Sequence, residues 1–517
     1  MKTFLRLIIA VAVAFSIPAI AEDLVILTTN DTHSNIESNP DGTAGVLPRK
    51  AIIDSVRKAE KNVLLVDAGD MVQGSLYFNF FRGDVEYPLF NKMGYDIRIL
   101  GNHEFDNGLK ELADHWKETT ADALASNYDF SDTPAKGIFK PYTIKKFDGK
   151  KIGFIGINID PTSIISDYNY KGMKWEDPVK AANKWAEYLK DKKKCDLVVA
   201  VTHIGYTTDV DKPTDIDLAR SSKDIDIIIG GHSHSFVDPK TPDKTPYWIK
   251  NAVGKPVLVT QTGKYGKNIG YIKIDLDDLK DHDYDYEWKA VTDRFPAKSL
   301  DRDIIDFLAP YKAKVDSINH TPIGWSDVDM DNSSAAYANW TADFGRVMAQ
   351  HIADSINAAG GSIPEIDLAV MNRGGIRQPM HKGVITEGGM LSTFPFSNVL
   401  QIVSMNGSDI IETMKQAAAK GGEAVSSEIR VSMDKNGNVE HVVYGYDEID
   451  PDKDYTVATI DYVSQGNDGL FGMKNHRMLW SDANKLSSRV IEYIRKQTSL
   501  GLPVTSDPSS RFVKMHD

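Results

Sequence analysis

The chain contains very little cysteine. Cys195 is the only cysteine among 517 residues, so no disulfide can form within one chain. Small secreted domains that depend on several disulfides are therefore excluded. Cys195 precedes the apolar run 197–201, where a buried structural thiol is a better interpretation than a nucleophile.

Long hydrophobic runs are absent after the first twenty residues, so we expect no membrane anchor in the mature chain. Residues 1–21 differ, because Lys2 and Arg6 precede an apolar run that ends in the small residues Ala19 and Ala21. This pattern predicts a secretory signal peptide. A transmembrane anchor is the weaker interpretation, since the run is too short to cross a bilayer. Export of a chain without disulfides favours a bacterial periplasm.

Positive charge is also in deficit, with 60 Lys and Arg against 73 Asp and Glu and a net charge of −13. An acidic surface argues against binding to nucleic acid polymers. Hydrophobic residues at 41% and charged residues at 26% are typical of a soluble globular protein, and the length suits two or more domains. We expect a monomer or a weak dimer.

Short β-rich runs alternate with helical stretches in the first half of the chain. This alternation predicts an α/β sheet covered by helices on both faces. The runs 257–260 and 271–276 are expected to close it as antiparallel strands. The other predicted strands are 24–29, 63–66, 97–100, 152–157, 197–201 and 225–229, with helices at 47–59 and 178–189.

A second α/β region is predicted near the C-terminus. The charged amphipathic stretch 301–318 is interpreted as a connecting helix, with an ordinary surface helix as an equal alternative. The expected domains are 22–297, a linker at 298–318 and 319–517. The C-terminal domain is expected to contain a helix at 342–358 and strands at 366–371, 399–404, 429–433, 439–444 and 456–460.

Polar clusters follow five of the predicted strands in the first half. Open α/β sheets bind ligands at the carboxyl ends of their strands, so these clusters should converge. Singly, each is a common capping or surface pattern. The clusters are Asn30-Asp31-Thr32-His33, Asp67-Ala68-Gly69-Asp70 with Gly74, Asn102-His103, Thr202-His203, and Gly230-Gly231-His232-Ser233-His234.

Together these clusters supply seven metal donors. One ion needs about four of them, so the set suits two ions, although a single catalytic zinc remains an alternative. Two divalent cations, with zinc or manganese the best fit to His and carboxylate ligands, would activate a water and clamp a phosphate. Asp70 would bridge them. Asp31, His33 and His234 would complete one site, and Asn102, His203 and His232 the other.

The turn 101–106 adds a candidate catalytic pair. His103 can act as acid, base or oxyanion partner, and Asp106, three residues later, can orient its ring.

These motifs resemble those of the bacterial periplasmic 5′-nucleotidase and UDP-sugar hydrolase family. The resemblance rests on the five clusters, on Gly101-Asn102-His103-Glu104-Phe105-Asp106, and on Asn372-Arg373-Gly374-Gly375-Ile376-Arg377 with Asn467-Asp468-Gly469, and so covers nearly the whole mature chain. It implies a four-layer α/β/β/α metallophosphoesterase domain, a linker helix, and a C-terminal α/β domain that binds the nucleoside. It also implies the seven ligands above and His103 with Asp106 as the catalytic pair.

The resemblance further implies substrate residues in the second domain. Arg373 and Arg377 should face phosphate or ribose, and Asp468 should accept hydrogen bonds from ribose hydroxyls. Tyr462 should stack on the base. Relatives have a second stacking aromatic in a segment that corresponds to 423–428, which here contains none.

The leading hypothesis is therefore an exported dimetal phosphohydrolase that acts on 5′-nucleotides, with nucleotide di- and triphosphates or UDP-sugars as further substrates. One alternative is a sulfur-ester hydrolase of the same superfamily. Another is a nonenzymatic binding protein on this scaffold, against which the intact donor set and His103 argue.

Overall fold

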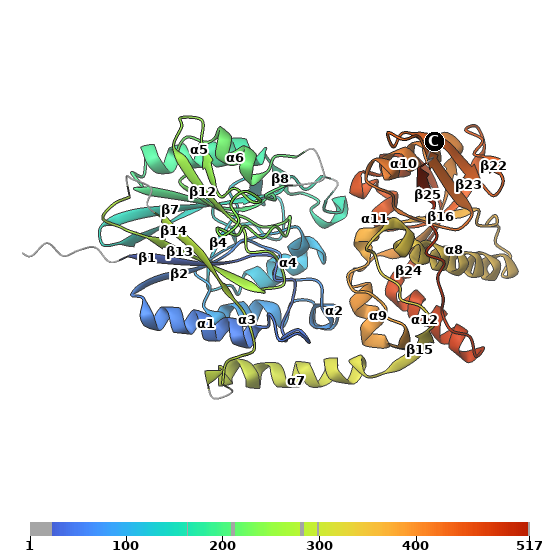
Figure 1. Ribbon diagram of the computed structural model, residues 1–517, viewed down its shortest axis with the longest axis horizontal. Helices are drawn as coiled ribbons and strands as arrows, with labels where there is room; N and C mark the ends of the chain where they lie inside the picture. The colour runs from blue at the N-terminus through green and yellow to red at the C-terminus, as the bar shows by residue number, and fades with distance from the viewer. Residues whose placement is uncertain (1–22, 163, 208–211, 280–283, 297–298, 515–517) are drawn as a thin grey trace, which may run out of the picture.

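The computed structural model describes residues 23–162, 164–207, 212–279, 284–296 and 299–514. The predicted signal peptide, 1–21, lies outside the described residues. Two regions are joined by the long helix α7 (Arg302–Asn319), which runs along one side of the molecule (Figure 1). Within the described ranges, no helix is both long and apolar enough to cross a membrane.

The first region contains two six-stranded sheets. The first sheet, in spatial order, consists of β14 (Tyr284–Ala290), β13 (Asn268–Ile274), β1 (Leu24–Thr29), β2 (Asn62–Asp67), β3 (Ile97–Ile99) and β4 (Asp122–Leu124). The second consists of β11 (Trp248–Lys250), β12 (Pro256–Thr260), β10 (Ile227–Ile229), β9 (Leu197–His203), β7 (Lys150–Asn158) and β6 (Tyr142–Phe147).

Burial along β1 shows why the two sheets stack. Leu24 and Ile26 belong to the core that the two sheets share, whereas Val25 and Leu27 pack in the core beneath the helices of the first sheet. Side chains alternate between the faces of a strand, so β1 is buried on both sides. The layers are therefore helix, sheet, sheet, helix.

Helices cover the outer face of each sheet (Figure 1). The helix α5 begins where the Asp177 side chain accepts the Lys180 N–H, with Pro178 in the first turn. The first sheet is covered by α1 (Val46–Ala59), α2 (Leu76–Phe81), α3 (Glu86–Met93) and α4 (Gly108–Trp116), and the second by α5 (Pro178–Asp191) and α6 (Asp215–Ser221). A short ladder joins β5 (Tyr128–Asp129) to β8 (Lys174–Trp175).

The strands divide between two sheets, as the four-layer α/β/β/α arrangement implied by the resemblance requires. One expectation about them needs correction. The run 257–260 was expected to be antiparallel, but β12 runs parallel to β10 and is antiparallel only to β11. The strand β13 does pair antiparallel with β1, as predicted.

The second region is built on a five-stranded sheet with one continuous hydrophobic core. That sheet contains β19 (Ala424–Val425), β16 (Leu368–Met371), β23 (Asp454–Ile460), β18 (Val399–Asn406) and β24 (His476–Lys485). The smaller sheets are β22 (Asp447–Glu448), β21 (Val439–Tyr444), β20 (Ile429–Met433) and β25 (Phe512–Lys514), and β15 (Pro322–Ser326) with β17 (Gly383–Thr386). The helices are α8 (Ala335–Ala358), α9 (Glu387–Thr393), α10 (Gly407–Ala419), α11 (Asp461–Ser464) and α12 (Leu486–Ser499).

Candidate active site

The predicted donors lie in loops after β1, β2, β3 and β10 and, for His203, at the last residue of β9, so they stand at the carboxyl ends of both sheets. Five of the seven have a left-handed backbone, with φ of 49° at Asp31, 46° at His33, 56° at Asp70, 81° at His232 and 56° at His234. Non-glycine residues rarely adopt this conformation, and such residues cluster at functional sites. The backbone turns sharply after each strand, and these turns bring the side chains together.

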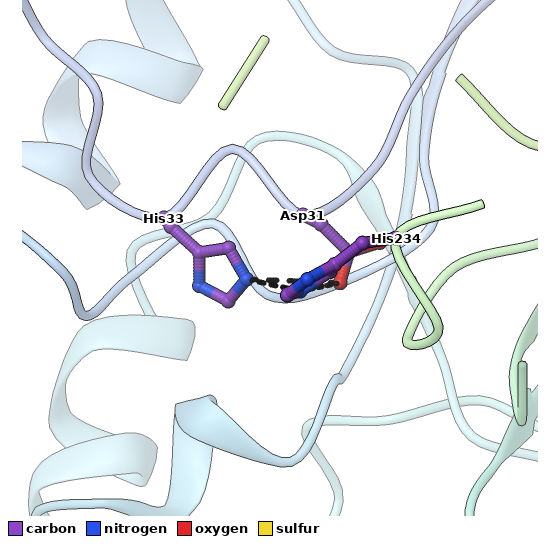
Figure 2. A group of neighbouring side chains, drawn as sticks. All are labelled: Asp31, His33 and His234. Atoms are coloured by element: carbon purple, nitrogen blue, oxygen red, sulfur yellow. Dashed lines mark hydrogen bonds and ion pairs between the residues drawn. The ribbon is translucent and has the colours of Figure 1, made fainter. Parts of the chain in front are cut away.

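Asp31, His33 and His234 form one donor group (Figure 2). The two imidazoles point toward one another, with 2.9 Å between their Nε2 atoms. The Asp31 Oδ1 atom lies 3.8 Å from His33 Nε2 and 3.5 Å from His234 Nε2. Burial lowers the pKa of both rings, that of His234 to about 3, so both are neutral and can donate lone pairs to a cation.

Asp70, His203 and His232 form a second group, which Asn102 joins. The Asn102 Oδ1 atom is 2.9 Å from His232 Nδ1. The His203 Nδ1 atom donates to the Ala68 carbonyl at 2.7 Å, which leaves Nε2 directed at Asp70 Oδ2, 3.2 Å away. A ring nitrogen fixed by a backbone carbonyl is typical of metal-ligating histidines.

The electrostatics of this second group favour a cation. Burial lowers the pKa of His203, but the Asp70 carboxylate outweighs it and raises that pKa to about 10. Asp70 is fully buried, yet His203 and the neighbouring imidazoles hold its pKa well below the usual range. A positive charge is thus strongly stabilised beside Asp70, and a bound metal ion supplies it as well as a proton does.

Asp70 lies between the two groups. Its Oδ2 atom is 3.2 Å from His203 Nε2 and 4.0 Å from His33 Nε2. It therefore occupies the position that the bridging hypothesis requires. The seven residues fit two metal ions by donor type, burial and convergence.

His103 and Asp106 stand beside this centre. The His103 Nδ1 atom lies 3.0 Å from Asp106 Oδ2, and the His103 backbone N–H donates to Asp70 Oδ1 at 2.9 Å. Burial lowers the pKa of His103, but the Asp106 and Asp70 carboxylates outweigh it, so the net shift is upward. His103 is thus oriented and can hold a proton next to the donors.

Glu104 ties the two central loops together, a role that sequence reasoning missed. Its buried carboxyl accepts the backbone N–H groups of Asp70 at 3.1 Å, Met71 at 3.0 Å, and Gly101. Burial raises the pKa of Glu104 to about 7, which the N–H donors oppose because they favour the ionised form. The carboxyl connects the loop that bears Asp70 to the loop that bears Asn102.

A cavity of about 550 Å³ opens onto this centre and is lined by both regions. From the first region it includes Asn102, His103, Asp106, His232 and Tyr168. From the second region it includes Asn372, Arg377, Phe396, Tyr462 and Asp468.

Three of the four predicted substrate residues line this cavity. The Asp468 carboxylate accepts the Tyr462 hydroxyl at 3.1 Å and the Asn372 amide at 2.7 Å. The Arg377 guanidinium lies 5.7 Å from the centre of the Phe396 ring, which in turn is 5.8 Å from the His103 ring. Arg377 is therefore near the catalytic pair, and Asp468 is next to Tyr462.

The fourth, Arg373, is not among the lining residues. Its backbone N–H donates to Glu423 at 2.8 Å, and its guanidinium approaches the Gly422 carbonyl at 3.4 Å. The structure thus directs Arg373 toward the segment where a second aromatic was expected.

The aromatic that was sought in residues 423–428 has a counterpart elsewhere. Phe396 lines the cavity together with Tyr462 and lies only nineteen residues after Arg377. The run Phe394-Pro395-Phe396 between a helix and a strand was the available signal, because a proline-flanked aromatic in a loop has no obvious place in a core.

The fold and the donor loops define a calcineurin-like phosphoesterase, and residues 24–236 match the model of that family. Residues 322–476 match the 5′-nucleotidase C-terminal domain. The chain therefore belongs to the family of 5′-nucleotidases that combine these two domains.

Individual relatives agree over most of the chain. It is 28% identical over 488 residues to a 5′-nucleotidase of Vibrio cholerae, covering 88% of this chain and 86% of that one. It is 27% identical over 494 residues to the trifunctional nucleotide phosphoesterase protein YfkN of Bacillus subtilis, covering 86% of this chain but only 32% of that protein. The crystal structure of a 5′-nucleotidase precursor from Thermus thermophilus is 27% identical, with a TM-score of 0.78 and coverage of 96% of this chain and 100% of that one.

Proposed function

We propose that this protein is an exported metal-dependent phosphohydrolase that releases phosphate from 5′-nucleotides. The observation that supports it most directly is the single cavity, which has metal donors and an oriented histidine on one side and aromatic, arginine and carboxylate side chains on the other. The proposed domains are a catalytic domain at 22–297, a linker at 298–318 and a substrate-binding domain at 319–517. The basic and apolar start of the sequence supports export to a periplasm.

Asp31, His33, Asp70, Asn102, His203, His232 and His234 would hold two divalent cations, with zinc or manganese the best fit. When bound, such ions supply an activated water and positive charge for the phosphate. His103, oriented by Asp106, holds a proton that it can give to the leaving ribose oxygen or share with a phosphate oxygen. Arg377 presents a guanidinium whose fork matches two phosphate oxygens.

The second domain would recognise the nucleoside. Phe396 and Tyr462 offer ring faces for a base. The Asp468 carboxylate, held by Asn372 and Tyr462, can accept hydrogen bonds from ribose hydroxyls. Arg373 stays a proposed contact for phosphate or ribose, and its backbone N–H, which donates to Glu423, fixes the loop that carries both arginines.

A phosphate-release assay over a panel of substrates tests this proposal. The panel contains 5′-nucleoside mono-, di- and triphosphates, a UDP-sugar, ribose 5-phosphate, an aryl phosphate and a thiosulfate ester. We expect nucleotides to be the best substrates, activity to disappear with a chelator, and zinc or manganese to restore it. Preference for the thiosulfate ester would favour the sulfur-ester alternative, and inactivity on every ester despite bound metal would favour a binding protein.

A further inference from the structure

Tyr168 is a third aromatic residue of the cavity, and it comes from the first region. It lies in the short helical turn η2 (Asp167–Asn169), and its side chain is 61% exposed. Phe396 and Tyr462, the other two aromatics, both belong to the second region. Ile164 and Ile165 of the same segment also line the cavity, together with Ser166 and Asn169. A large, exposed aromatic that lines a cavity offers area that a ligand can bury.

The segment that carries Tyr168 contacts both halves of the site. The Asn169 amide donates to the backbone carbonyl of Asp106 at 3.3 Å, which ties the segment to the catalytic turn. The Tyr168 hydroxyl lies 3.5 Å from the Asp461 carboxylate, and Asp461 directly precedes Tyr462 in sequence. Tyr168 therefore belongs to a segment that is bonded to the turn bearing His103, and its hydroxyl lies next to Asp461, the residue before Tyr462.

We propose that Tyr168 is a specificity-determining residue, whose ring contacts the base of the nucleotide from the catalytic domain. This inference rests on the proposed function. Phe396 and Tyr462 both belong to the second region, whereas Tyr168 belongs to the segment that Asn169 ties to the turn bearing His103 and Asp106. The Tyr168 ring can contact the base only when the nucleotide is placed correctly relative to the turn that bears His103 and Asp106. The contact therefore links recognition of the base to the position of the phosphate.

The test compares two substrates that differ only in the base, namely a 5′-nucleotide and ribose 5-phosphate. Tyr168→Ala should raise KM for the nucleotide about 5-fold or more, the lower end of base stacking on an aromatic ring. KM for ribose 5-phosphate should change less than twofold. Tyr168→Phe should restore the nucleotide KM, since the ring makes the contact. Tyr446→Ala, a matched change at a fully exposed tyrosine that does not line the cavity, should alter KM for neither substrate.

Three outcomes would overturn the inference. Tyr168→Ala could leave the nucleotide KM unchanged, or it could impair both substrates equally, which would indicate a general effect on the site. Tyr168→Phe could be as impaired as Tyr168→Ala, which would assign the effect to the hydroxyl and Asp461. A wild-type protein that hydrolyses no nucleotide would instead refute the proposed function, and the inference with it.

Discussion

At the scale of single residues, the loops that bear the proposed metal donors hold strained backbone conformations, and these conformations make the donor side chains converge. A left-handed conformation costs a non-glycine residue on the order of 1 kcal/mol, so it persists only where the surroundings enforce it. Here the backbone N–H of Asp31 donates to the Gly69 carbonyl, and that of His33 donates to Asp70, each at 2.9 Å. These bonds join the loop after β1 to the loop after β2, and the side chains converge as a result.

The proposed bridging role of Asp70 can be separated by experiment from the proposed catalytic role of His103. Asp70→Ala should abolish binding of both metals together with activity, because Asp70 lies within 4.0 Å of a nitrogen in each donor group. His103→Ala should keep both metals and lose about 10²-fold or more in kcat, since it removes only proton transfer. Elemental analysis combined with phosphate release distinguishes the two. A fully active Asp70→Ala protein would contradict the two-metal proposal.

Glu104 should matter for stability and for metal binding alike. Glu104→Ala would leave three buried backbone N–H groups without a partner. Such groups cost about 1 to 3 kcal/mol each, so we expect the free energy of unfolding to fall by at least about 3 kcal/mol. Metal affinity should fall as well, because the two loops are no longer joined. Urea unfolding and metal titration measure the two effects. Glu104→Gln, which keeps one acceptor oxygen, should be intermediate, and a loss below about 0.5 kcal/mol would show that the carboxyl is dispensable.

The donors could be predicted from sequence because each follows an apolar run that ends in a short polar motif. Phe396 could not be placed in the same way, since no pattern relates it to Tyr462 across 65 intervening positions. The two arginines that flank Gly-Gly-Ile look equivalent in sequence. Only Arg377 lines the cavity, while the backbone N–H of Arg373 donates to Glu423 and its guanidinium approaches the Gly422 carbonyl.

At the scale of elements, the positions of strands were predictable but their partners were not. Strands such as β9 are buried on both faces and read as uninterrupted apolar runs, which carry no information about which sheet they join. Short strands at the edges, such as β11 and β6, lack a clear pattern altogether and were missed. Pairing is decided by contacts between distant parts of the chain, so the strand pattern alone does not give the division into two sheets, which only the family resemblance implied.

The two aromatic loops of the second region should act as one recognition element. Tyr462→Ala and Phe396→Ala should each raise KM for nucleotides by the equivalent of about 1 to 3 kcal/mol, the range of base stacking on aromatic rings. A small aryl phosphate should be little affected, because it need not reach both rings. Steady-state kinetics on the two substrates decide the matter. Equal losses on both would mean that the rings only support the fold.

At the scale of the whole molecule, the metal donors all precede residue 235, and the proposed nucleoside contacts of the second domain all follow residue 371. The connecting helix α7 packs against the protein and does not run free through solvent. Ile304, Leu308 and Val315 of α7 are buried in the core beneath the first sheet. The helix therefore packs on the first region, and its C-terminal end also contacts α9 of the second region.

The most direct test of this division between metal binding and nucleoside recognition is to measure the hydrolysis of nucleotides by the first region alone. A fragment of residues 23–320 keeps α7 on its core, and circular dichroism and elemental analysis can establish that it folds and binds two metal ions. We predict that it cleaves a simple aryl phosphate slowly and shows no preference for a 5′-nucleotide over ribose 5-phosphate, whereas the full chain prefers the nucleotide. If the folded fragment instead hydrolyses nucleotides as efficiently as the full chain, then Arg377, Phe396, Tyr462 and Asp468 are not substrate residues, and the proposed division of labour is wrong.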